Sequence, residues 1–139
     1  MKVGSKIGAV EDSKLLIYVV DDEIMVAEVV QAVLNLRAYQ VRLFDNPQAA
    51  LDAFITADPK PDLLFTDYVM GEMSGLDLIE KCKQLHPPLK TLLYSGSVGH
   101  ELWEESATKP DNFLSKPFQP KTLLDAVHNA LRGRKSDST

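Results

Sequence analysis

Acidic, hydroxyl and basic residues follow four short apolar runs of this chain, each at the point where the run ends. The pair Asp21–Asp22 and the single Asp67 end two of the runs, and Ser95–Gly96 and Lys116 end the other two. Short apolar runs are typical of buried strands in a parallel sheet, and open α/β sheets bind ligands at the carboxyl ends of their strands. If these runs are strands of one sheet, three carboxylates, a hydroxyl and an amine meet in one pocket.

The chemistry of such a pocket follows from these residue types. Three carboxylates repel one another unless a cation lies between them. Oxygen ligands without His or Cys favour Mg²⁺, which commonly combines one or two carboxylates with phosphate oxygens. The Lys116 amine would neutralise the other side of a phosphoryl group, and the Ser95 hydroxyl and Gly96 amide could donate to its remaining oxygen. We therefore predict a phosphoryl-transfer site in which Asp67 is the nucleophile and forms an acyl phosphate.

Each part of this pattern has a simpler interpretation when it stands alone. A single aspartate such as Asp67 more often caps the following loop or helix, and Asp21–Asp22 is also a common loop or cap sequence. Lys116–Pro117 is usually just exposed in a loop, and Ser95–Gly96 is usually a turn. The combination is specific because each part follows its own apolar run, in the chain order that the pocket requires.

Strand-like and helix-like segments alternate along the rest of the chain. Apolar and β-branched runs predict strands at 15–20, 41–44, 63–65, 89–94 and 112–114. Apolar residues at helical spacing predict helices at 26–36, 47–55, 76–85, 100–107 and 120–131, of which 100–107 has the weakest pattern. Asn46 is the expected cap of the second helix and Pro47 its first residue.

This alternation predicts an α/β fold with a doubly wound, five-stranded parallel sheet and helices on both faces. The strand order 2-1-3-4-5 of flavodoxin-like folds suits five strands. It places the first and third strands side by side at the switch point, so that Asp21, Asp22, Asp67, Ser95 and Lys116 emerge at the same edge.

Composition sets the limits of the interpretation. The chain has 139 residues, 45% of them hydrophobic, which predicts one domain over 14–132 with a flexible leader at 1–13 and a polar tail at 133–139. A net charge of -5 disfavours direct binding to nucleic acid. Neither a signal peptide nor an apolar run of about 20 residues is seen, which predicts no membrane association. The single Cys82 cannot form an internal disulfide, which is consistent with a cytoplasmic protein.

The motifs resemble the receiver domain of bacterial two-component response regulators (CheY-like) over roughly Lys14 to Leu131. The matching stretches are Val20-Asp21-Asp22-Glu23, Thr66-Asp67-Tyr68-Val69-Met70 with Ser74-Gly75 beyond, Tyr94-Ser95-Gly96, and Lys116-Pro117-Phe118. The resemblance implies a flavodoxin-like receiver fold and a signalling protein rather than an enzyme. It also implies that Asp67 receives a phosphoryl group from a sensor histidine kinase or a phosphotransfer protein.

The resemblance assigns further roles in the site. Mg²⁺ would be held by Asp22, Asp67 and the main-chain carbonyl of Val69, with Asp21 acting through water. The phosphoryl group would be stabilised by Lys116, Ser95 and Gly96. Ser95 and Phe113 correspond to a switch pair, the Lys116–Pro117 peptide bond should be cis, and an unknown output partner should bind the face from His100 to Leu131.

Two departures and two alternatives stand beside this prediction. The family commonly has Pro where this chain has Gly71, and Phe113 has no hydroxyl. A phosphatase with an aspartyl nucleophile needs a proton-transferring residue two positions after Asp67, where this chain has Val69. A receiver-like scaffold that binds partners without phosphate is the other alternative, and the sequence leaves open whether the chain is a stand-alone receiver or a fragment.

Overall fold

The computed structural model describes residues 15–96, 101 and 103–133. Strands and helices alternate through this part of the chain. They are β1 (Leu16–Val20), α2 (Ile24–Asn35), β2 (Gln40–Phe44), α3 (Pro47–Thr56), β3 (Leu63–Asp67), α4 (Gly75–Leu85), β4 (Lys90–Ser95), β5 (Asn112–Ser115) and α5 (Pro120–Leu131).

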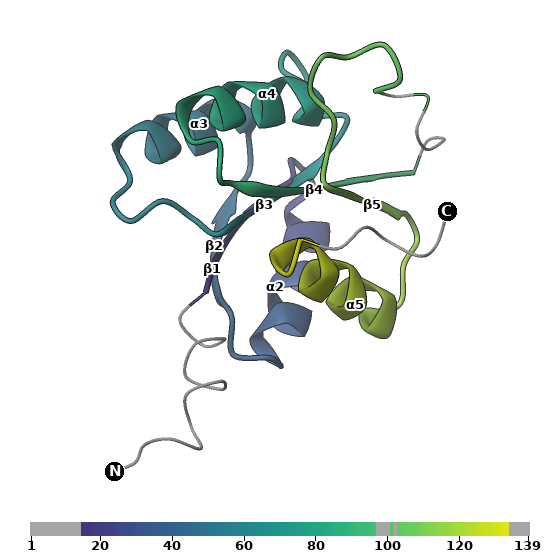
Figure 1. Ribbon diagram of the computed structural model, residues 1–139. Coiled ribbons are helices and arrows are strands. Elements are labelled where there is room, and N and C mark those ends of the chain that lie inside the picture. The colour runs from purple at the N-terminus through teal and green to yellow at the C-terminus, as the bar shows by residue number, and fades with distance from the viewer. Residues whose placement is uncertain (1–14, 97–100, 102, 134–139) are drawn as a thin grey trace.

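The strands form one parallel sheet in the order β2-β1-β3-β4-β5, as the sequence predicted. Figure 1 shows α2 and α5 on one face of this sheet and α3 and α4 on the other. The register pairs Val20 of β1 with Thr66 of β3, so the residues that follow them, Asp21 and Asp67, leave the sheet side by side. Ser95 of β4 pairs with Ser115 of β5, which places Lys116 at the same edge.

Helices on both faces explain why the central strands are apolar without interruption. All five residues of β3 are buried. Because successive side chains of a strand point to opposite faces, Leu63 and Phe65 pack in the layer beneath α2 and α5, whereas Leu64 packs beneath α3 and α4. The sheet thus separates two apolar cores, and the strand ends lie between them.

Local capping signals fix two of the helix starts beside the site. The Asn46 side chain accepts a hydrogen bond of 2.7 Å from the Ala49 amide, and Pro47 is the first residue of α3, as predicted. Ser74 and Asp77 form a reciprocal capping box at the start of α4. These caps set where each helix begins relative to the strand end that precedes it.

The helix α2 buries only one side of the broad apolar pattern seen in the sequence. Its buried residues are Ala27, Val30, Val33 and Leu34. Met25, Val29 and Leu36 are exposed, so an apolar surface remains on the side of α2 that faces away from the sheet.

The helix expected at 100–107 is the clearest difference from the prediction. Its described residues, 101 and 103–107, form no α-helix, and Trp103 begins a turn that the hydrogen bond from the Ser106 amide to the Trp103 carbonyl closes at 3.0 Å. Charged and polar residues dominate this segment, so it lacks the apolar face that would pack a helix onto the sheet. His100, the leader 1–13 and the tail residues 134–139 lie outside the described residues.

Candidate functional site

Asp67 is the last residue of β3, and its side chain is almost enclosed, with 6% of the residue exposed. The Tyr68 amide donates to Asp67 Oδ1 at 2.8 Å, and Lys116 Nζ lies 3.3 Å from Asp67 Oδ2. Burial raises the pKa of Asp67 to about 6 although Lys116 acts to lower it, and the charge of Asp21 adds to the rise. Ionised Asp67 is thus destabilised mainly by burial, and a cation bound beside it would stabilise the ionised form.

Three aspartates converge at this edge of the sheet, as predicted. One carboxylate oxygen from each of Asp21, Asp22 and Asp67 lies within 4.8 Å of the others. Asp21 and Asp67 are buried, whereas Asp22 is exposed. Carboxylate oxygens without His or Cys are the donor set that Mg²⁺ prefers, so the residues present fit this ion.

Lys116 directly follows the carboxyl end of β5, and its side chain reaches these carboxylates from there. Its amide donates to the Ser95 carbonyl at 2.9 Å, and the Lys116–Pro117 peptide bond is cis, as the sequence predicted. Lys116 Nζ lies 3.8 Å from Asp21 Oδ2 and 3.9 Å from Glu23 Oε1, in addition to its contact with Asp67. One amine thus faces three carboxylates.

Six of the predicted site residues, together with Glu23, line a hollow of about 420 Å³. Its lining is formed by Asp22, Glu23, Asp67, Val69, Ser95, Gly96 and Lys116. Val69 is apolar and 61% exposed beside the hollow. Asp21, expected to act through water, does not line it and is fully buried.

Two residues of the site were not predicted from the sequence. Glu23 lines the hollow and contacts Lys116, and the acidic run Asp21-Asp22-Glu23 was a signal for it. Tyr94 donates a hydrogen bond from its hydroxyl to Asp21 Oδ2. Burial, followed by the hydrogen bond to Asp21, raises the pKa of Tyr94 far above its ordinary value, so the hydroxyl remains a donor. From the sequence, Tyr94 was placed at the end of the predicted strand 89–94 and in the motif Tyr94-Ser95-Gly96, and its hydroxyl was given no role in the site.

The residues expected to form a switch pair lie in different surroundings. Ser95 is buried and lines the hollow, whereas Phe113 lies in β5, is half-buried and does not line it. The Phe113 ring packs against Trp103 with the ring centroids 5.2 Å apart. Trp103 is itself half-buried, so part of the only tryptophan remains accessible on this side of the molecule.

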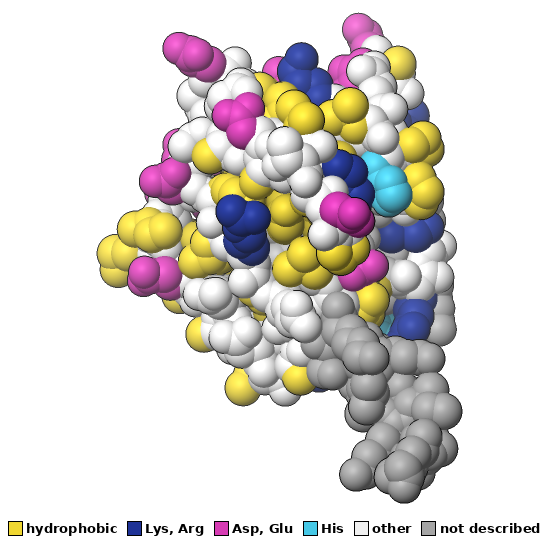
Figure 2. Space-filling view, turned by 90° about the vertical axis from the view of Figure 1, so that its left-hand side faces the viewer, with side chains coloured by type: hydrophobic (Ala, Val, Ile, Leu, Met, Phe, Trp, Pro, Cys, Tyr) yellow, Lys and Arg dark blue, Asp and Glu magenta, His cyan; other side chains and the backbone are white. Residues whose placement is uncertain are grey.

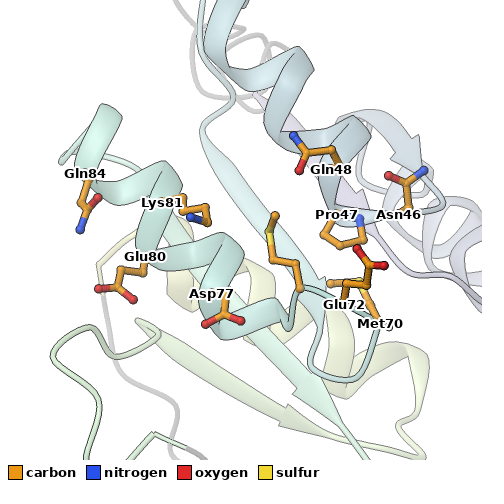
Figure 3. A pocket seen from close by; sticks show the side chains of 10 residues that line it. Asn46, Pro47, Gln48, Met70, Glu72, Asp77, Glu80, Lys81 and Gln84 are labelled. Atoms are coloured by element: carbon orange, nitrogen blue, oxygen red, sulfur yellow. The ribbon is translucent and has the colours of Figure 1, made fainter.

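A larger hollow of about 710 Å³ lies beside the loop that follows Asp67. Figure 3 shows its side chains coming from that loop (Met70, Glu72), from the start of α3 (Gln48) and from α4 (Glu80, Lys81). Thr66 Oγ1 lies 3.8 Å from Met70 Sδ, which connects the wall of this hollow to β3. Its lining carries acidic, amide and thioether groups. Among the described residues, the carboxylates that converge closely enough to hold a metal ion are those of Asp21, Asp22 and Asp67, at the other hollow.

Charge is mixed on the face shown in Figure 2, where basic and acidic side chains lie interspersed among apolar ones. Through the part of the chain that the structure describes, no helix has the length and apolar character needed to cross a membrane.

The sheet is doubly wound, and the aspartates that follow or end β1 and β3 meet the Lys116 ammonium at its switch point, where open α/β sheets bind ligands. The model of the family described as "Response regulator receiver domain" matches residues 17–128. The chain therefore belongs to the response regulator receiver domain family of two-component systems.

Relatives and solved structures agree with this assignment. The response regulator receiver protein CpdR of Brucella abortus is 32% identical over 119 residues, which cover 85% of this chain and 97% of CpdR. The phosphate regulon transcriptional regulatory protein PhoB of Pseudomonas aeruginosa is 27% identical, and the match covers 84% of this chain but only 51% of PhoB. The chain thus spans about half of that relative and nearly all of CpdR. A CheY-like receiver domain from Methanospirillum hungatei JF-1 shares the fold with a TM-score of 0.76, 23% identity, and coverage of 85% of this chain and 94% of the other.

Proposed function

We propose that this chain is a signalling receiver that accepts a phosphoryl group on Asp67 from a sensor histidine kinase or a phosphotransfer protein. The observation that supports this most directly is the arrangement around Asp67: a buried carboxylate with an ammonium 3.3 Å away and two further aspartates within 4.8 Å. The receiver domain is proposed to span 14–132, which contains the family match at 17–128.

The proposed reaction moves one phosphoryl group without net oxidation or reduction. A carboxylate oxygen of Asp67 attacks the phosphorus of a phosphohistidine, the new O–P bond forms, and the N–P bond breaks with its electron pair returning to the imidazole. Lys116 would neutralise one phosphoryl oxygen, and the Ser95 hydroxyl and Gly96 amide would donate to another. These groups line the hollow beside Asp67, so no large rearrangement is required.

The metal assignment is part of the same proposal. Asp22, Asp67 and the main-chain carbonyl of Val69 would hold Mg²⁺, with Asp21 acting through water. When bound, the ion supplies positive charge to the phosphoryl oxygens as they approach the acidic pocket. The exposure of Asp22 and the position of Val69 in the lining support these two as accessible oxygen donors.

The surfaces around the site support two kinds of protein contact. The helix α2 begins directly after the run Asp21-Asp22-Glu23, and its first turn exposes Ile24 and Met25. A phosphodonor protein must cover the hollow, so we propose that it also contacts this apolar surface. We propose the face from His100 to Leu131 for the output partner; its described part includes β5, α5 and the half-buried Trp103.

Phosphorylation by a small donor tests the function. Incubation with acetyl phosphate and Mg²⁺ should add one phosphoryl group to the protein, seen by intact-mass spectrometry. Asp67→Asn should take none. Asp22→Ala should lose the Mg²⁺-dependent reaction yet remain folded, because removing one of the repelling carboxylates is neutral or stabilising.

The same assay separates the alternatives. A parent protein that stays unmodified would favour a scaffold that binds partners without phosphate. Multiple turnover of p-nitrophenyl phosphate would favour a phosphatase instead. Normal phosphorylation of Asp22→Ala would reject the metal assignment while leaving Asp67 as the acceptor.

A further inference from the structure

Tyr94 stands out among the buried residues because its hydroxyl donates to Asp21, one of the three converging aspartates. The residue is fully buried in β4, and its hydroxyl donates to Oδ2 of Asp21, which is also fully buried. The ring is held from two sides: its centroid lies 4.5 Å from that of Phe65 and 6.0 Å from that of Phe118. Since this packing fixes the ring, it also fixes where the hydroxyl lies.

The contacts of Asp21 show what the hydroxyl does there. Asp21 Oδ1 accepts the Glu23 amide at 2.9 Å, and Oδ2 accepts the Tyr94 hydroxyl. Lys116 Nζ lies 3.8 Å from the same Oδ2, beyond a normal hydrogen bond. A buried carboxylate requires donors, and here the protein supplies them without bringing Lys116 into direct contact with Asp21.

The ring of Tyr94 contacts Lys116, the other group that could satisfy the Asp21 carboxylate. Lys116 Nζ lies 4.6 Å from the ring centroid, which is within the range of a cation–π interaction. The same ammonium is closer to Asp67, at 3.3 Å, than to Asp21. Tyr94 therefore contacts both the buried anion and the cation that lies between the two carboxylates.

We propose that Tyr94 is a positioning residue of this site: its hydroxyl satisfies Asp21, and its ring holds Lys116, so that the Lys116 ammonium stays beside Asp67. This inference rests on the proposed function of Asp67 as phosphoacceptor. Without the hydroxyl, the buried Asp21 carboxylate would lose a donor and would attract Lys116 away from Asp67. With this donor lost and Lys116 displaced, the carboxylates that would hold Mg²⁺ carry more uncompensated negative charge. Asp67 also has less positive charge beside it to neutralise an incoming phosphoryl group.

The substitution Tyr94→Phe removes the hydroxyl and keeps the ring. Titration of the protein with MgCl₂ in a calorimeter should show Mg²⁺ binding that is tighter by about threefold to tenfold, the range expected for the loss of one typical hydrogen bond. Phosphorylation by acetyl phosphate at saturating Mg²⁺ should slow by a similar factor, about threefold to tenfold, because Lys116 has moved from the acceptor. Tyr94→Leu, which also removes the ring face, should slow phosphorylation further.

The Asp21→Asn background separates positioning from packing. With a neutral residue at position 21, the Tyr94 hydroxyl no longer satisfies an anion, and its loss no longer draws Lys116 toward Asp21. Glu23 is present in both backgrounds. Adding Tyr94→Phe should therefore leave both Mg²⁺ affinity and phosphorylation rate unchanged. Equal Mg²⁺ affinity in the parent and in Tyr94→Phe would overturn the proposal, as would the same Tyr94→Phe effect in both backgrounds. In either case Tyr94 would be a packing residue only.

One measurement needs no substitution at Tyr94. The parent protein should show a slowly exchanging tyrosine hydroxyl proton by NMR that is lost in Asp21→Ala, and its absence from the parent would overturn the proposal even if Tyr94→Phe does not fold. The Mg²⁺ titration also separates a failure of the Tyr94 proposal from a failure of the proposed phosphoacceptor function. If the parent accepts no phosphoryl group, the proposed function fails, whereas the affinity difference still decides whether Tyr94 positions Asp21 and Lys116.

Discussion

At the scale of single residues, the balance between burial and charge at Asp67 determines how the site behaves before phosphate arrives. Burial disfavours the ionised form, Lys116 favours it, and Asp21 opposes it again, with the net result that the pKa of Asp67 rises to about 6. A carboxylate with a raised pKa in the folded state destabilises that state once it is ionised. Ionised Asp67 is therefore destabilising near neutral pH, and a cation bound beside it would relieve this.

This destabilisation predicts a pH-dependent stability difference between the parent and Asp67→Asn in the absence of divalent cations. The unfolded pKa of Asp67 is near its ordinary value of 3.8, below the folded value of about 6, so the parent loses stability as pH rises between these values. Urea unfolding should show that the advantage of Asp67→Asn grows by on the order of 2 kcal/mol between about pH 4.5 and about pH 7.5.

The exposed Asp52 provides the control for that measurement. Asp52→Asn tests whether an aspartate-to-asparagine change alone produces such a pH dependence. If the stability difference for Asp67→Asn is constant across this pH range, Asp67 is not the destabilising group that its surroundings indicate.

At the scale of the elements, two glycines with different surroundings lie between Asp67 and the first turn of α4. Gly71 has a φ of 81°, a left-handed conformation that Pro cannot adopt. The loop of this chain therefore has a backbone conformation that would not accept the Pro expected at this position from the resemblance. Gly75 begins α4, and its amide donates to the Tyr68 carbonyl at 2.9 Å. A Cβ on Gly75 would lie 2.0 Å from the Asp67 carbonyl oxygen, so the start of α4 lies directly on the backbone of the acceptor.

Substitution of these two glycines should separate overcrowding from backbone strain. Gly75→Ala should destabilise the fold by about 1–3 kcal/mol and slow acetyl phosphate labelling, because either Asp67 or α4 must move. A Cβ on Gly71 meets nothing within 4 Å, so Gly71→Ala should cost only the left-handed conformation, about 1–2 kcal/mol, with little change in labelling. Unfolding and labelling rates of both variants check this, and normal labelling of Gly75→Ala would show that the contact does not position Asp67.

The helix α2 offers a second prediction at this scale, because its apolar exposed residues lie at different distances from the site. Met25 is in the first turn, beside the acidic run, and is 77% exposed; Leu36 follows the last turn and is 75% exposed. Met25→Gln should lower the rate of phosphoryl transfer from a protein donor by about fivefold to tenfold and leave labelling by acetyl phosphate unchanged.

Leu36→Gln is the matched control, with equal exposure at the opposite end of α2. It should affect neither reaction, and both substitutions should change stability by less than about 0.5 kcal/mol because they are at the surface. Equal losses in the two variants would mean that the donor is not guided by the end of α2 near the site.

At the scale of the whole molecule, what the sequence predicted depended on whether the signal was local. The cap at Asn46 and the apolar runs are written in adjacent residues. Together with the alternation of elements, the apolar runs were enough to predict the order of the sheet and the meeting of Asp21, Asp22, Asp67 and Lys116. The role of Tyr94 was not predictable, because it depends on a contact with Asp21, 73 residues away in sequence. The helix predicted at 100–107 was wrong for its described residues, 101 and 103–107, because a weak periodicity was taken to indicate a helix.

The sheet also connects the acceptor to the far side of the molecule through β4 and β5. Ser95 lines the hollow and ends β4, Phe113 lies on the neighbouring β5, and Trp103 packs on the Phe113 ring. If Ser95 and Phe113 act as the switch pair, phosphorylation of Asp67 turns the Phe113 ring inward and removes a contact from Trp103.

Because Trp103 is the only tryptophan, its fluorescence should report this change directly. Phosphorylation with acetyl phosphate and Mg²⁺ should shift the emission to longer wavelength and increase quenching by acrylamide, since the half-buried indole loses its aromatic neighbour. Asp67→Asn should show neither effect, and Phe113→Leu should already show the longer wavelength without phosphate. An emission spectrum that stays unchanged in fully phosphorylated protein would mean that Phe113 does not move, and that the signal leaves the site through another part of the β4–β5 edge.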